Sequence, residues 1–153
     1  MAPPSDEIPV IVPVSAVLAA TDRAVVALLQ IDVYSEGIEF VLTSRLTRVE
    51  DDDDEWWEAV RVFIGSDRDD GGGPDLSLEL PDGTVLEPDF GFRPRRDLDT
   101  PPEGHSLMRT RMRAGGNTTS ASSDPGFWLW PFPPDGPVVL RMAASDFELA
   151  AAE

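Results

Sequence analysis

Two runs of alternating apolar residues, placed on either side of a short turn, constrain this chain more than any other feature. Within residues 25–34 and again within 38–46, apolar side chains recur at every second position. Ser35-Glu36-Gly37 separates the runs, and glycine accepts the positive φ that many tight turns require. Period-two alternation places apolar side chains on one face of a strand. The sequence therefore predicts a β-hairpin over residues 25–46.

Proline and glycine restrict the rest of the chain to short elements. The 153 residues include 15 Pro and 12 Gly, which interrupt helices and favour turns. Residues 8–14 contain two prolines and suit only an edge strand or an extended lead-in, and residues 114–126 are expected to be a flexible connection. Further strands are expected near residues 76–80, 85–87, 107–113, 127–132 and 138–142. The predicted class is all-β: an antiparallel β-sandwich, immunoglobulin-like or similar, of about seven to nine strands, with an open barrel as the alternative.

Two short helical segments are expected beside the strands. Asp53 or Asp54 is placed to cap a helical turn near residues 54–62. Ser145-x-x-Glu148 is a capping-box pattern, which predicts a short C-terminal helix. Residues 1–7 are predicted to be a flexible tail, and residues 8–153 a single β domain.

The charge of the chain is strongly unbalanced. It has 29 acidic residues and 12 basic ones, for a net charge of −17. Such a surface repels nucleic-acid phosphates and anionic membranes, so we expect neither as a partner and favour another protein, possibly a basic one. Acidic residues concentrate at 51–54 and 67–75 and arginines at 93–113, which predicts a domain polarised in charge. The N-terminal stretch before the first apolar run lacks positive charge, which predicts a cytoplasmic location. The oligomeric state stays open.

Few residues are suited to catalysis. The chain has one histidine, His105, and no cysteine, which removes most nucleophile–base arrangements. We therefore expect a non-catalytic protein without a cofactor. An enzyme that uses paired carboxylates is the less favoured alternative.

One acidic loop begins like a calcium-binding loop. The pattern then fails, because Gly71 and Leu78 stand where oxygen ligands are needed. An acidic surface loop is the preferred interpretation, and no metal is expected. The alternative is weak calcium binding by Asp67, Asp69, Asp70 and Asp75.

The four tryptophans form two pairs with different implications. Trp56 and Trp57 are adjacent and point apart, so one of them is a candidate for contacting a partner protein, together with Asp53 and Asp54. Trp128 and Trp130 leave the same face of a strand. They form part of the core or, as an alternative, a stacking platform in a small-ligand or carbohydrate-binding module.

Three arginines alternate along one predicted strand. Arg109, Arg111 and Arg113 are expected to form a row on one face. Such a row contacts an anion or an acidic partner, or else pairs with carboxylates of the same chain. With a net charge of −17, pairing within the chain is the preferred interpretation.

Two segments resemble a family of uncharacterised actinobacterial proteins. The first is TDRAVVALLQIDVYSEGIEFVLTSRL at residues 21–46, with its Gly-x-Glu-Phe sequence, and the second is FWLWPFPPDGPVVLRM at residues 127–142, with its Trp-Pro-x-Pro-Pro-x-Gly-Pro sequence. The resemblance covers about half of the chain and implies a shared hairpin and proline-braced strand. It implies no activity. The acidic run before Trp56 and the ending after Leu149 depart from the family pattern.

Overall fold

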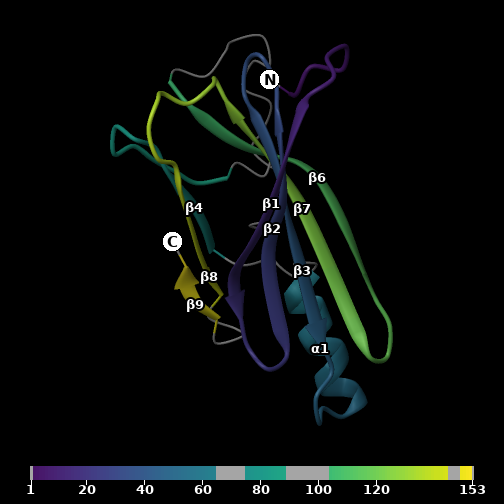
Figure 1. Ribbon diagram of the computed structural model, residues 1–153. Coiled ribbons are helices and arrows are strands. Elements are labelled where there is room, and N and C mark those ends of the chain that lie inside the picture. The colour runs from purple at the N-terminus through teal and green to yellow at the C-terminus, as the bar shows by residue number, and fades with distance from the viewer. Residues whose placement is uncertain (1, 65–74, 89–103, 145–148, 153) are drawn as a thin grey trace, which may run out of the picture.

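Two antiparallel sheets form most of the protein (Figure 1), whose computed structural model describes residues 2–64, 75–88, 104–144 and 149–152. Sheet A has the strand order β1-β2-β3-β7-β6, and sheet B has the order β5-β4-β8-β9. The predicted all-β, sandwich-like class is confirmed. The strands of sheet A are β1 (Val10–Ala20), β2 (Ala24–Val33), β3 (Ile38–Thr47), β6 (Ser106–Gly116) and β7 (Ser120–Trp130). Those of sheet B are β4 (Asp75–Glu79), β5 (Val85–Leu86), β8 (Val139–Ala144) and β9 (Leu149–Ala152).

The hairpin predicted over residues 25–46 is present as β2 and β3, which pair from Ala24 opposite Leu46 to Val33 opposite Ile38. The backbone N–H of Tyr34 donates to the carbonyl oxygen of Gly37 at 2.9 Å and closes the turn. Gly37 is needed for space: a Cβ there would lie 2.4 Å from the carbonyl oxygen of Leu129 on β7. The turn therefore packs directly on a third strand.

Strands β6 and β7 form a second long hairpin, which corrects the prediction of a flexible connection over residues 114–126. Their pairing continues from Ser106 opposite Trp130 to Gly116 opposite Ala121. Glycine and serine are weak strand formers, but tertiary packing overrides that preference here. Ala121 and Ser123 are buried, and their small side chains suit positions where space is limited. A Cβ at Gly116 would already lie 3.3 Å from Val60 of the neighbouring helix.

The helix α1 (Asp53–Ile64) confirms the helical turn expected near residues 54–62 and extends it. Its cap is Asp52 rather than Asp53 or Asp54. The backbone N–H of Glu55 donates to Asp52 Oδ1 at 2.8 Å, and the N–H of Asp52 donates to Glu55 Oε2 at 3.2 Å. These reciprocal bonds form a capping box one residue earlier than the cap we expected.

The C-terminal segment differs from the sequence prediction. Residues 149–152 form strand β9, where Leu149 lies opposite Ala144 of β8 and Ala152 opposite Met142, instead of a short helix. The capping-box pair Ser145 and Glu148 lies outside the described residues. Pairing with β8 satisfies backbone groups that an isolated helical turn would leave exposed, which explains why strand replaces helix.

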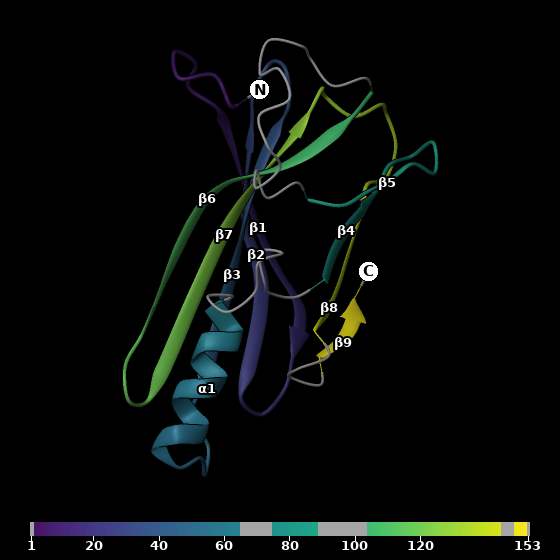
Figure 2. The ribbon, with the colours of Figure 1, turned by 180° about the vertical axis from the view of Figure 1, so that it is seen from behind.

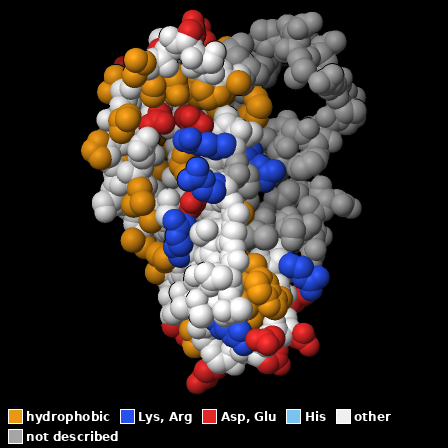
Figure 3. Space-filling model, turned by 90° about the vertical axis from the view of Figure 1, so that its right-hand side faces the viewer, with side chains coloured by type: hydrophobic (Ala, Val, Ile, Leu, Met, Phe, Trp, Pro, Cys, Tyr) orange, Lys and Arg blue, Asp and Glu red, His pale blue; other side chains and the backbone are white. Residues whose placement is uncertain are grey.

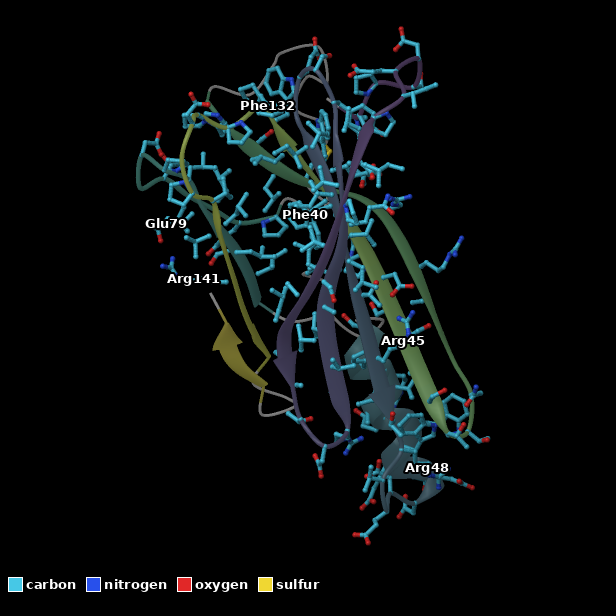
Figure 4. The ribbon with its side chains drawn as sticks, viewed as in Figure 1. Phe40, Arg45, Arg48, Glu79, Phe132 and Arg141 are labelled. Atoms are coloured by element: carbon cyan, nitrogen blue, oxygen red, sulfur yellow. The ribbon has the colours of Figure 1, made fainter. Side chains whose placement is uncertain are left out.

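One hydrophobic core joins both sheets and the helix. Sheet A contributes its inner face, which carries Phe40, Leu42 and Leu46, and the opposite side of sheet A is its outer face. Figure 2 shows α1 at the lower end of sheet A and sheet B higher up beside it. In Figure 4 Phe40 points between the sheets, whereas Arg45 lies on the other side of sheet A. The core also contains Trp56, Val60, Phe63, Leu76, Leu78, Leu80, Leu107, Ala121, Phe127 and Leu129.

Candidate interaction surfaces

The adjacent tryptophans have opposite environments. Trp56 is fully buried in the core, and its indole Nε1 donates to the carbonyl oxygen of Asn117 at 2.8 Å. Trp57 points away and is 43% exposed. The expectation that one of the pair is exposed is met by Trp57, while Trp56 has a structural role and is not accessible to a partner.

The acidic run before the helix is engaged within the chain. Asp51 forms an ion pair with Arg23 at 3.0 Å, and Asp53 forms one with Arg48 at 2.9 Å. Arg48 also donates to the carbonyl oxygens of Asp51 and Thr118. The run therefore fixes the start of α1 against the tip of the β6–β7 hairpin. Asp54 is exposed beside Trp57.

The calcium alternative falls largely outside the described residues. Asp67, Asp69 and Asp70 lie there, and Asp75 begins β4. In the part of the chain that the structure describes, no group of three or more acidic or histidine side chains is arranged to hold a metal ion. Within the same residues no helix is long and apolar enough to cross a bilayer.

A β-bulge divides the predicted row of arginines. The pairing of β6 with β7 shifts between Arg109 and Arg111. Arg109 lies opposite Phe127, a core residue, and so belongs to the inner face, whereas Arg111 and Arg113 lie opposite Gly126 and Asp124. The sequence pattern could not reveal the extra residue, Thr110, because a bulge leaves no periodic signal of its own.

Arg45 of β3 takes the third position on the outer face. It forms an ion pair with Asp124 at 2.7 Å, and Arg111 Nε lies 3.6 Å from Glu39 Oε1. The arginine side chains are 48% and 55% exposed, whereas those of Asp124 and Glu39 are 21% and 10% exposed. Figure 3 shows arginines in a column on this face, with acidic side chains among them. Pairing within the chain is thus present, and the charge that faces solvent in these pairs is positive.

Two buried carboxylates lie beside each other on the outer face, and the sequence analysis did not single them out. Asp32 and Glu39 are direct cross-strand partners in β2 and β3, and both are buried. Gln30 Nε2 donates to Asp32 Oδ1 at 2.5 Å, and the Thr110 hydroxyl donates to Glu39 Oε1 at 2.8 Å. These bonds, together with Arg111, offset the cost of burying two like charges.

Trp128 and Trp130 do not form an exposed two-ring platform. Trp128 is fully buried but lies outside the main core, because it alternates with the core residues Phe127 and Leu129. Tyr34 meets its ring edge-to-face, with centroids 5.5 Å apart. Trp130 is half-buried. The stacking surface required for the carbohydrate-binding alternative is therefore missing one of its two rings.

Tyr34 has a perturbed titration. Burial raises the pKa of its phenol, and the negative charges of Glu39 and Asp32 raise it further. Neutral Tyr34 is thus part of the packing over Trp128.

Among the described residues, the largest group of exposed apolar side chains lies on the first two strands and just before them. Ile8, Val10, Ile11, Val12, Val17 and Leu29 are all exposed, Val17 at 66% and Leu29 at 49%. Ile11 lies opposite Asp32, and Val17 lies opposite Ala27, so both point to the outer face. We call the outer-face residues Ile11, Val17, Val25 and Ala27, together with the exposed Leu29 at the bulge of β2, the apolar strip. The signal for it was present in the sequence, since residues 8–20 and 24–31 contain no charged residue.

No protein-family model, curated protein or solved structure matches this chain. The resemblance to the actinobacterial family therefore stays a prediction.

Proposed function

We propose that this protein is a non-catalytic, cytoplasmic interaction module that binds another protein through the apolar strip. The single observation that carries the proposal is the concentration of exposed apolar side chains on β1 and β2. Contiguous exposed apolar surface on a charged protein marks interaction sites. The strip is a better candidate than the Trp57 region, where one exposed aromatic ring is surrounded by charge.

The backbone edge of β1 is poorly suited to strand addition, so the contact is expected through side chains. Pro9 and Pro13 lack the N–H group that a partner strand would accept. The pairing of β1 with β2 also shifts twice, after Pro13 and after Val17, and such bulges distort an edge. A partner is therefore expected to cover the outer face of β1 and β2.

The proposal is tested by affinity capture with matched variants. Immobilised protein is exposed to extract of the native host, and retained proteins are identified by mass spectrometry. A specific partner should be retained by the native chain and lost with the double variant Val17→Glu/Leu29→Glu. Val85→Glu is the control, because Val85 is 56% exposed on β5, away from the strip. Equal retention by all three proteins would contradict the proposed surface.

A further inference from the structure

The apolar strip is neutral on a chain whose net charge is −17. On the outer face Asp32 and Glu39 are buried, and Asp124 is mostly covered and paired with Arg45, whereas Asp22 in the turn between β1 and β2 is exposed. In Figure 3 hydrophobic side chains gather along the left margin of this face, next to the column of arginines. The strip and its border thus differ in charge from the rest of the protein.

This charge distribution discriminates between possible occupants. A strongly basic partner would gain from contact with the exposed acidic residues, such as Asp54, and would gain little from an uncharged strip. A second copy of this chain is itself strongly acidic, so exposed acidic residues would repel it, because juxtaposed like charges oppose association. Two such chains can approach closely only where carboxylates are absent. The strip meets this condition, because none of its members is charged.

The geometry suits a closed, symmetric contact. The strip lies on the outer face of an antiparallel sheet, and two such faces pack about 10 Å apart with interleaved side chains. Because one patch would meet the same patch on the other copy, the contact closes as a two-fold dimer instead of continuing into a fibre. Pro9 and Pro13 on the adjacent edge disfavour the alternative of edge-to-edge strand pairing.

We propose that the occupant of the apolar strip is a second copy of this chain, packed face to face about a two-fold axis through β1 and β2. This inference rests on the proposed function, since it names the partner of the same surface.

Sedimentation equilibrium of the full chain tests the inference. The native protein should show a concentration-dependent mass that reaches twice that of the chain. Val17→Glu/Leu29→Glu should raise the dissociation constant at least about tenfold, because each substitution places charge in the interface twice. Val85→Glu should leave the constant unchanged. Val17 and Leu29 are exposed in the single chain, so the variants should keep the native circular dichroism spectrum. Added salt should strengthen the dimer by screening the repulsion between two acidic chains.

A covalent probe gives a second, independent measurement. The chain has no cysteine, so Val17→Cys introduces a single thiol. Mild oxidation should link two copies of Val17→Cys in solution and should not link Val85→Cys. A protein that stays monomeric, or a dimer that Val17→Glu/Leu29→Glu leaves intact, overturns the second-copy inference. If the protein is monomeric, the capture experiment still tests the proposed function. The proposed function then holds if a host protein binds the native chain and does not bind Val17→Glu/Leu29→Glu.

Discussion

The indole Nε1 of Trp56 donates a hydrogen bond to the backbone carbonyl oxygen of Asn117 at 2.8 Å. This bond joins the first turns of α1 to the tip of the β6–β7 hairpin. The side chain of Asn117 organises that tip, because its Oδ1 accepts from the backbone N–H groups of Thr119 and Ser120 at 2.9 and 3.0 Å. This bond therefore adds a directional contact to the apolar packing of the helix against the hairpin.

Trp56→Phe should destabilise the protein more than Trp128→Phe does. Both tryptophans are fully buried, but among the described residues the indole Nε1 of Trp128 has no hydrogen-bond acceptor. Both substitutions reduce volume, whereas only Trp56→Phe removes a hydrogen bond and only Trp128→Phe removes an unsatisfied donor. The difference in unfolding free energy should be about 1–3 kcal/mol, measured by urea denaturation. Equal losses would show that the bond to Asn117 contributes nothing.

The capping role of Asp52 can be separated from its charge. Asp52→Ala should lower the unfolding free energy by about 1 kcal/mol, because the backbone N–H of Glu55 loses its acceptor. Asp52→Asn removes the same charge and keeps a side-chain oxygen, so its cost should be a few tenths of a kcal/mol. Thermal and urea unfolding of the two variants measure this difference. Similar values for both would assign the effect to charge and not to the cap.

Much of the fold follows from local patterns in the sequence. The β2–β3 hairpin could be predicted because its apolar residues alternate on both sides of Gly37, and α1 because an acidic cap precedes an amphipathic segment. The β6–β7 hairpin could not, since Gly115, Gly116 and the serines near residue 120 have the composition of a loop. That segment forms strand through pairing of β7 with β3 and packing against α1, and a local pattern contains neither.

The candidate surfaces were less predictable for a similar reason. A bulge at Thr110 moves Arg109 to the inner face, and strand pairing brings Arg45 beside Arg111, although 66 positions separate them in the printed sequence. The sequence alone does not show which of the adjacent Trp56 and Trp57 is exposed. The structure answers this, because Trp56 is buried and Trp57 is exposed. The apolar strip differs, because the lack of charge over residues 8–20 and 24–31 is visible in the sequence and only the exposure of the strip required the structure.

Gly37 and Gly115 should respond very differently to alanine. A Cβ at Gly37 would lie 2.4 Å from the carbonyl oxygen of Leu129 and 2.8 Å from the ring of Trp128, whereas a Cβ at Gly115 would meet nothing within 4 Å. Gly37→Ala must displace the turn from β7 and should cost about 3 kcal/mol. Gly115→Ala should change the unfolding free energy by less than about 0.5 kcal/mol. Urea titrations give both values, and a tolerated Gly37→Ala would contradict the close packing of this turn.

Tyr34 should ionise at a pH above the ordinary tyrosine pKa of 10.0, since burial and the nearby charges of Glu39 and Asp32 raise its pKa. Tyr34 is the only tyrosine in the chain, so the near-ultraviolet absorbance of tyrosinate reports it directly. Glu39→Gln should move the titration towards 10.0, whereas Glu36→Gln, on the exposed turn, should have a smaller effect. Because the folded state favours the neutral phenol, its stabilising contribution is complete below the unfolded pKa and is lost as the pH rises through the folded one. Tyr34→Phe should therefore make stability less sensitive to pH in that window, and an unchanged alkaline unfolding curve would refute this linkage.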